Sequence, residues 1–259
     1  MVVLVKRLRQ KLRKELVFET NNSMVNDYIT QLVFRSEVAP LTYHFRFKLD
    51  GSSPFVFIPG QYLLLKIGEF FRQFSICSYQ MEDNTFDLVA DYFKGGLASE
   101  YLLSLKEGDK VFFKGPAGVF IQQPVVRPVV YLATGTGVAP ILAMIDSVVK
   151  KEDLTHPFYL FWGVETENDA YFIPQLTLLK QKQSLFTFAL CLSQQEELIA
   201  PPFYKGHIQD NIFALLGESL LLSNCDVYVC GGKEAVESLK EFSLTNGVPK
   251  EHLYFERFN

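Results

Sequence analysis

The stretch that decides the fold is Val129–Pro140, which reads VVYLATGTGVAP. Five apolar residues, 129–133, predict a buried strand, and the residues that follow the turn predict a helix. Gly135 and Gly137 let the backbone of the turn approach a bound diphosphate, which the positive end of the helix would favour. Pro140 suits the first turn of that helix, where a missing N–H costs little. The same glycines also suit a turn that serves packing alone, so the motif needs support from the rest of the chain.

The second half of the chain alternates strand-like and helix-like segments. We expect further strands at 158–162, 185–192, 226–230 and 253–258, with helices at 138–150 and near 173–181, 208–216 and 234–245. Apolar strands separated by helices are typical of a doubly wound parallel sheet. We therefore predict a five-stranded α/β domain over residues 127–259, with a boundary at 122–127 beside two prolines.

The first half follows a different pattern, in which apolar and polar residues alternate. We expect strands at 28–34, 41–47, 61–67, 72–79, 85–92 and 110–114, and one helix from Leu97 to about Leu105. Six short antiparallel strands, separated by Gly, Pro, Asp and Asn, favour a closed barrel or a sandwich over residues 26–122.

Composition excludes several classes of function. The formal net charge of −4 argues against nucleic-acid binding. The four cysteines are scattered through apolar segments, as expected of a reduced, cytoplasmic protein rather than a disulfide framework. Cys225 and Cys230 match the first gap of a plant-type iron–sulfur motif, but the third cysteine is missing, and the four histidines lack metal-ligand spacing. We expect no metal, no membrane span and no hydrolase chemistry.

The segment before residue 26 is basic and amphipathic. Leu4, Leu8, Leu12 and Leu16 recur every four residues among six lysines and arginines. Three interpretations stay open for residues 1–25: a helix on an anionic membrane surface, an organelle-targeting peptide, or an extension that flanks the catalytic core, with Met24 as the true start. Membrane contact is expected only through this segment.

A second candidate anion site lies in the first half. Gly95 and Gly96 end a strand, and Ser99 falls in the first turn of the next helix, so N–H groups and a hydroxyl could meet a pyrophosphate. Ser99 could equally be an ordinary helix cap. Arg72 stands among phenylalanines on a strand, and a diphosphate would pair with its charge.

Together these motifs resemble the ferredoxin–NADP(+) reductase superfamily, over nearly all of residues 26–259. The segments that carry the resemblance, in order, are Arg72–Ser75, Gly96–Ser99, Gly115–Gly118, Gly135–Pro140, Val229–Gly232 and Phe255–Phe258. The resemblance implies an antiparallel barrel that binds flavin and an α/β domain that binds NAD(P)H. It also implies that the cofactors carry the redox chemistry while the protein positions their two rings.

The resemblance assigns roles to individual residues. It implies a catalytic group of Ser75 beside the reactive edge of the flavin, Cys230 near the nicotinamide, and Glu256 and Phe258 closing the flavin pocket. The residues it implies for binding FAD are Arg72, Gln73, Phe74, Ser75, Gly95, Gly96 and Ser99. Those implied for the nicotinamide nucleotide are Gly135, Thr136, Gly137, Pro140, Ser193, Gln194, Cys230 and Gly231.

Three departures from the family pattern bear on the cofactors. Phe74 replaces a tyrosine, so one hydroxyl contact with the flavin is lost. Glu165 stands where arginine is common in the family, and Gln194 stands where members that select NADPH often carry arginine. A 2′-phosphate would find little compensation there. We therefore expect FAD as the cofactor and NADH as the preferred donor.

Three functions remain open from the sequence. The chain could pass electrons from NAD(P)H through FAD to a protein acceptor such as a ferredoxin, an oxygenase component or a cytochrome. It could instead reduce free flavin as a substrate. Alternatively, it could be a flavin-bearing relay subunit without turnover of its own.

Overall fold

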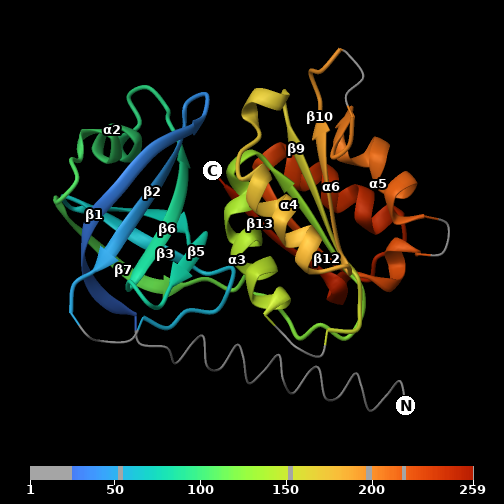
Figure 1. Ribbon diagram of the computed structural model, residues 1–259, viewed down its shortest axis with the longest axis horizontal. Coiled ribbons are helices and arrows are strands. Elements are labelled where there is room, and N and C mark those ends of the chain that lie inside the picture. The colour runs from blue at the N-terminus through green and yellow to red at the C-terminus, as the bar shows by residue number, and fades with distance from the viewer. Residues whose placement is uncertain (1–24, 52–54, 151–153, 197–199, 218–219, 259) are drawn as a thin grey trace.

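The computed structural model describes residues 25–259, except 52–54, 151–153, 197–199, 218–219 and 259. The expected basic segment therefore lies outside the described residues. The chain forms two β-sheets, one from each half of the sequence. Each sheet is the centre of one body, and the two bodies lie side by side (Figure 1).

The first sheet is antiparallel and is called the barrel below. Its order is β4-β3-β7-β1-β2-β6-β5. Its elements are β1 (Asn26–Ala39), β2 (Thr42–Leu49), β3 (Tyr62–Ile67), β4 (Phe70–Ser75), β5 (Ser78–Gln80), β6 (Thr85–Asp91), α2 (Leu97–Ser104) and β7 (Lys110–Ala117). The two edge strands, β4 and β5, are joined by only two residues, so the sheet must curl round on itself. Aromatic rings such as Phe47, Phe86 and Phe113 fill its interior at ring-centre distances of 5.1–5.6 Å.

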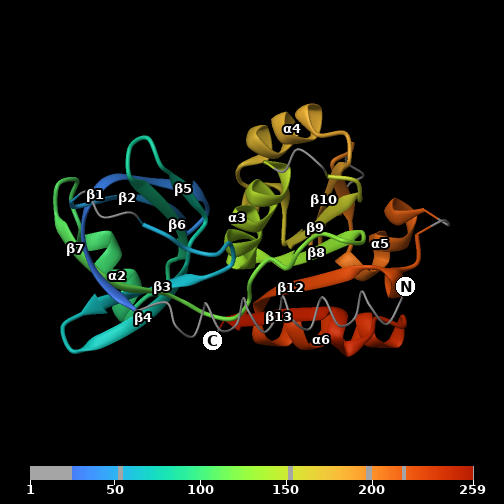
Figure 2. The same cartoon turned by 90° about the horizontal axis from the view of Figure 1, so that it is seen from below.

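The second sheet is parallel, with the order β11-β10-β9-β8-β12-β13, and is called the α/β domain below. Its elements are β8 (Val129–Thr134), η1 (Gly135–Gly137), α3 (Val138–Val149), β9 (Phe158–Val164), η2 (Glu167–Asp169), α4 (Ile173–Lys182), β10 (Phe186–Leu192), β11 (Phe203–Lys205), α5 (Ile208–Leu216), η3 (Leu222–Asn224), β12 (Asp226–Gly232), α6 (Lys233–Thr245), η4 (Lys250–His252) and β13 (Leu253–Phe258). Helices α3 and α4 cover one face, and α5 and α6 cover the other (Figure 2). The apolar strands are buried on both sides as a result.

The two-domain class predicted from the sequence is confirmed, and each sheet has one strand more than expected. The expected strand 72–79 is two strands, because the chain leaves one edge of the barrel at Ser75 and joins the opposite edge at Ser78. The extra strand of the parallel sheet is β11, whose three residues are too few to show a hydrophobic period.

Helix α3 joins the two bodies. The larger core of the α/β domain continues into the barrel residues Ala39, Cys77, Val89 and Phe120. A Cβ atom on Gly60 would lie 2.0 Å from the Phe120 carbonyl oxygen and 2.4 Å from the end of Met144 on α3, so residue 60 must be glycine.

The connection between the bodies is also hydrogen-bonded to the parallel sheet. The Tyr131 hydroxyl donates to Gln122 at 2.6 Å, and the Tyr228 hydroxyl accepts from the Gln123 N–H at 2.9 Å. Burying these hydroxyls without partners would be unfavourable. The hydrogen bonds to Gln122 and Gln123 therefore favour one position of the connecting segment on the parallel sheet.

Candidate functional site

The glycine turn after β8 has two kinds of glycine. Gly135 is exposed, has a φ of +51°, and a Cβ atom there would meet nothing within 4 Å. Gly137 is buried, and a Cβ atom there would lie 2.3 Å from the Cys230 carbonyl oxygen. Gly231 mirrors it, since its Cβ would be 2.0 Å from the Thr134 hydroxyl. Gly137 therefore allows the turn to pack against β12, and Gly231 allows the end of β12 to pack against β8. Gly135 shapes the exposed side of the turn.

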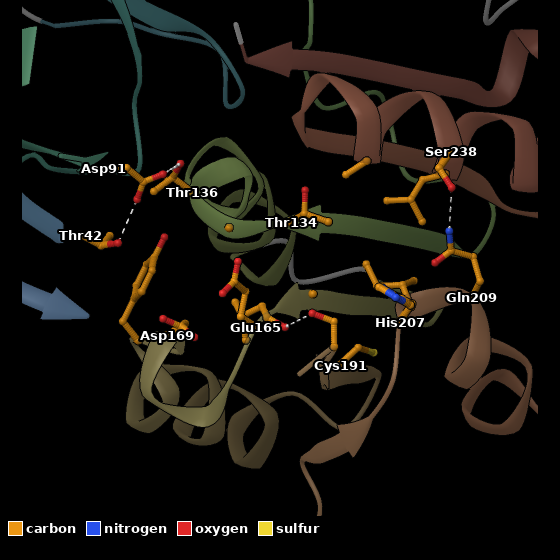
Figure 3. A pocket seen from close by; sticks show the side chains of 18 residues that line it. Thr42, Asp91, Thr134, Thr136, Glu165, Asp169, Cys191, His207, Gln209 and Ser238 are labelled. Carbon is orange, nitrogen blue, oxygen red and sulfur yellow. Dashed lines mark hydrogen bonds between the residues drawn. The ribbon is translucent and has the colours of Figure 1, made fainter. Parts of the chain in front are cut away.

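A pocket of about 510 Å³ opens beside this turn. It is lined by the turn itself and by the ends of β9 and β10, and helices α5 and α6 supply the wall farthest from the barrel. Thr42 and Asp91 come from barrel strands, so the pocket spans both bodies (Figure 3). Its size and its place at the carboxyl ends of parallel strands are those of a ligand site in a doubly wound fold.

The pocket is acidic. Asp91, Glu165 and Asp169 line it, and among the described residues that line it none is lysine or arginine. His207, at the start of α5, is the single lining residue that can carry a positive charge. A ligand with extra negative charge would be repelled here.

Asp91 connects the two bodies at the pocket. Its carboxylate accepts a hydrogen bond from the Thr42 hydroxyl at 2.9 Å and from the Thr136 hydroxyl at 2.8 Å (Figure 3). Thr136, which was expected to contact the nucleotide, lines the pocket, and its hydroxyl donates to a barrel residue. On the other side of the turn, the Trp162 indole N–H donates to the Gly135 carbonyl at 2.9 Å. The turn is thus held from both domains.

The motif predicted to bind flavin lies on β4, an edge strand. Residues 70–73 are exposed, Phe74 is half-buried and Ser75 is buried. The Arg72 guanidinium donates to the Phe71 carbonyl at 2.9 Å and lies 5.8 Å from the centre of the Phe70 ring. An exposed cation beside exposed aromatic rings is suited to a ligand with a flat ring and a diphosphate.

The predicted pyrophosphate turn, residues 93–99, uses part of its hydrogen-bonding capacity internally. The Ser99 hydroxyl accepts from the Phe93 N–H at 3.0 Å, and the Gly95 N–H donates to the Glu100 carboxylate at 3.1 Å. Gly96 is confined, because a Cβ atom there would lie 2.9 Å from the Phe93 carbonyl. Gly96 is the N-cap residue of α2, and no side chain accepts a hydrogen bond from the first N–H groups of this helix. Those N–H groups are therefore available to an anion.

The ends of β12 and β13 lie between the two bodies, where the C-terminus is marked in Figures 1 and 2. Cys230 pairs with Glu256 across these strands. Burial raises the pKa of the Cys230 thiol well above its ordinary value, so the thiol is neutral. Burial also raises the pKa of Glu256 to about 7. Phe258 pairs with Gly232 and is half-buried against the core of the α/β domain.

The residues expected to select between NADH and NADPH follow β9 and β10. Glu165 and Ser193 line the pocket, whereas Gln194 is exposed and outside the lining, its N–H bonded to the Glu165 carbonyl at 2.8 Å. Pro140 is buried in the first turn of α3, as expected. Sequence reasoning did not find Thr42, Asp91, Asp169, Tyr171 or His207, which also line the pocket. The one available signal was a charged residue, Asp91, at the end of a predicted strand.

The described part of the chain contains neither a candidate metal site nor a candidate membrane-spanning helix. No group of three or more His, Cys, Asp or Glu side chains there could hold a metal ion. Within the same residues, no helix combines the length and the apolar character that crossing a bilayer requires.

Comparison with known proteins identifies the family. The model of the oxidoreductase FAD-binding domain matches residues 30–121, and that of the oxidoreductase NAD-binding domain matches residues 131–241. The chain belongs to the ferredoxin–NADP(+) reductase superfamily of FAD- and NAD(P)-binding oxidoreductases. FAD and NAD(P)H, the cofactors expected from the sequence, are those of these two domains.

Several similar curated proteins are reductases or electron-transfer components. The toluate 1,2-dioxygenase electron transfer component of Pseudomonas putida is 29% identical over 205 residues, 78% of this chain and 59% of that protein. The reductase component of propane 2-monooxygenase from Rhodococcus jostii is 27% identical, over 78% of this chain and 55% of that protein. Ferredoxin–NADP reductase B of Sorangium cellulosum is 28% identical, over 88% of this chain and 96% of that protein. The chain thus spans less than two thirds of the first two relatives.

Solved structures show the same fold. A cytochrome P450 reductase from Amycolatopsis superposes with a TM-score of 0.80 at 23% identity, covering 90% of this chain and 70% of that one. Ferredoxin–NADP(+) reductase from Plasmodium falciparum gives a TM-score of 0.74 at 18% identity, covering 90% and 97%.

Proposed function

We propose that this chain is an NADH-preferring flavoprotein reductase that holds FAD on β4 and passes electrons to a redox protein. The observation that carries the proposal is the pocket itself, in which the glycine turn of the α/β domain faces Asp91 and Thr42 of the barrel. A nucleotide in this pocket would lie beside both domains, as electron transfer between two bound cofactors requires.

The residues present fit FAD. The exposed aromatic strand around Arg72 suits the flavin ring and a phosphate, and the uncapped start of α2 suits the second phosphate. FAD held there would supply the redox chemistry, which is acceptance of a hydride (two electrons and one proton) from NAD(P)H, with NAD(P)+ as the product, and release of electrons to the acceptor.

The chain contributes position and proton control. Glu256, with its pKa raised to about 7, can hold or release a proton at the end of β13 near neutral pH. The neutral thiol of Cys230 places no second negative charge beside it. Phe258 is the last residue of β13, whose end lies between the two bodies (Figure 2). An aromatic ring at that end could cover a flat cofactor and exclude water.

The preference for NADH is argued from charge. NADPH carries a 2′-phosphate that NADH lacks, and the pocket offers it carboxylates without lysine or arginine among the described lining residues. The acceptor is proposed by analogy with the relatives, which serve dioxygenases and a monooxygenase. A ferredoxin, an oxygenase component or a cytochrome fits this class.

Two measurements on the purified protein test the proposal: the identity of the extracted chromophore and the kinetics with each nicotinamide nucleotide. The chromophore extracted from the protein should be FAD, and kcat/KM with an artificial electron acceptor should be higher for NADH than for NADPH. FMN as the sole chromophore, or a higher kcat/KM for NADPH, would contradict the corresponding part of the proposal.

A specific observation favours a second candidate function, reduction of free flavin. Glu100 already accepts the Gly95 N–H and the Tyr92 hydroxyl at 2.9 Å, which puts a carboxylate where a pyrophosphate would bind. Phe74 also lacks the hydroxyl that tyrosine would offer the flavin. Both features would weaken flavin binding, and saturation kinetics with added FMN or riboflavin would identify this alternative.

A further inference from the structure

Asp91 stands between the two predicted cofactor sites. It is the last residue of β6, directly before the turn at residues 92–99, and its backbone carbonyl accepts from the Ser99 hydroxyl at 3.3 Å. Its carboxylate accepts from Thr136, the middle residue of the glycine turn. Asp91 therefore joins two turns by hydrogen bonds. Its backbone carbonyl bonds to the turn before α2, which is predicted to hold the flavin, and its carboxylate bonds to the glycine turn at 135–137, called the nucleotide turn below.

The Asp91 carboxylate is itself held in place. Thr42 on the neighbouring strand β2 is buried and donates to one oxygen, and Thr136 donates to the other. Two bonds to different oxygens fix the rotation of the carboxylate as well as its location. The barrel consequently presents a rigid anchor to the turn.

We propose that Asp91 is a positioning residue that sets the placement of the nucleotide turn relative to the flavin barrel, and so governs the rate at which NADH reduces the flavin. This inference rests on the proposed function of the pocket. Asp91 acts through Thr136. The residues on either side of Thr136 are held by the α/β domain, Gly137 by its close packing on Cys230 and Gly135 by its hydrogen bond from Trp162. Transfer between two rings is sensitive to displacements of about 1 Å, which can lower a rate by about 100-fold.

The alternative role for the same atoms is direct binding. If the Thr136 hydroxyl served the nucleotide itself, Asp91 would compete for it and repel the diphosphate. Removing Asp91 would then tighten NADH binding, and removing the Thr136 hydroxyl would weaken it. The positioning role predicts that both changes slow flavin reduction in the same way.

A double-mutant cycle separates these roles. Asp91→Ala, Thr136→Val and the double variant should each lower the limiting rate of flavin reduction by NADH by roughly tenfold, with the double variant no slower than either single one. Thr136→Ser keeps the hydroxyl and should restore at least half of the native rate. Thr30→Val is the matched control, since it removes a buried threonine hydrogen bond, to Val111 at 2.9 Å, within the barrel alone. It should lower stability and leave the rate unchanged.

A measurement independent of turnover accompanies the cycle. Amide hydrogen exchange of a peptide covering residues 131–141, measured without NADH, should speed up in Asp91→Ala and Thr136→Val and stay native in Thr30→Val. Independent, multiplicative effects on the rate, or native rates in both single variants, would overturn the positioning role. If the native protein itself fails to reduce flavin with NADH or NADPH, the proposed function is wrong. The hydrogen-exchange result still shows whether the Asp91–Thr136 hydrogen bond holds the glycine turn.

Discussion

Gly137 packs directly against the backbone of Cys230, at a distance that excludes any side chain. A Cβ atom on residue 137 would approach the Cys230 carbonyl oxygen to 2.3 Å and the Cα of Gly231 to 2.6 Å. The glycine turn, which resembles a phosphate-binding loop, is therefore also the point where the chain after β8 packs against the end of β12.

The two glycines of this turn should respond differently to substitution. Gly137→Ala forces the glycine turn away from β12 and should lower the free energy of unfolding by about 3 kcal/mol or more, by the overpacking seen in rigid cores. Gly135→Ala meets open space and bears only the left-handed φ, at about 1 kcal/mol. Urea denaturation of both variants measures the difference, and equal losses would show that the contact is not decisive.

Tyr171 should tolerate the loss of its hydroxyl. Its side chain lines the pocket at 5% exposure, and its buried hydroxyl has no hydrogen-bond partner among the described residues. Tyr171→Phe removes an unpaired polar atom, so the free energy of unfolding should stay the same or rise by up to about 1 kcal/mol.

The control for this change is Tyr131→Phe. That hydroxyl is equally buried but donates to Gln122 at 2.6 Å, so its removal should destabilise by about 1–3 kcal/mol. Chemical denaturation should show a lower free energy of unfolding for Tyr131→Phe and an unchanged or higher one for Tyr171→Phe. A loss in Tyr171→Phe as large as that in Tyr131→Phe would contradict the assignment of an unpaired hydroxyl.

Glu256 should make stability depend on pH near neutrality. Its pKa is raised from 4.5 to about 7, so between these values the folded protein binds a proton that the unfolded chain does not. The free energy of unfolding should therefore fall as pH rises through this window, by at most about 1.4 kcal/mol per pH unit from this group.

Glu256→Gln removes this contribution. Denaturant midpoints measured from pH 5 to pH 8 should fall less steeply for the variant than for the native protein, and the other titrating groups cancel in the comparison. Parallel profiles for the two proteins would show that the carboxyl titrates at its ordinary pKa.

The acidic lining should determine the choice of nucleotide. Glu165→Arg should raise kcat/KM for NADPH about tenfold, equivalent to about 1.4 kcal/mol, because it replaces repulsion of the 2′-phosphate by attraction. It should exceed the effect of Gln194→Arg, since Gln194 lies outside the pocket lining. Glu167→Arg makes the same charge change at an exposed position outside the lining, and an equal gain there would refute a local effect.

The sequence predicted most of the fold because its main signals are local. Segments such as Val129–Ala133 and Ile208–Leu216 carry the hydrophobic period of their element, and their bounds agree with the structure to within a residue. Strand β11 was missed because its pairing with β10 comes from tertiary context, not from its three residues. The split between β4 and β5 depends on the curl of the barrel, which no local pattern encodes.

The site was predictable only where it lies on one motif. The turn at Gly135 and the strand around Arg72 are short motifs of consecutive residues, so both could be picked out from the sequence. Asp91 and Thr42 enter the pocket by the packing of the barrel against the turn, and they are 45 and 94 residues from Thr136 along the chain (136 − 91 and 136 − 42). Such contacts follow from the placement of the domains, and their one signal in the linear pattern is the charge of Asp91 at the end of a predicted strand.

Anaerobic stopped-flow mixing of the purified, FAD-loaded protein with NADH tests the central claim most directly. The account predicts complete loss of the oxidised flavin absorbance at one NADH per FAD, faster with NADH than with NADPH at equal concentration. A flavin spectrum that neither nucleotide changes would contradict the claim that this chain transfers electrons from NAD(P)H to its own flavin.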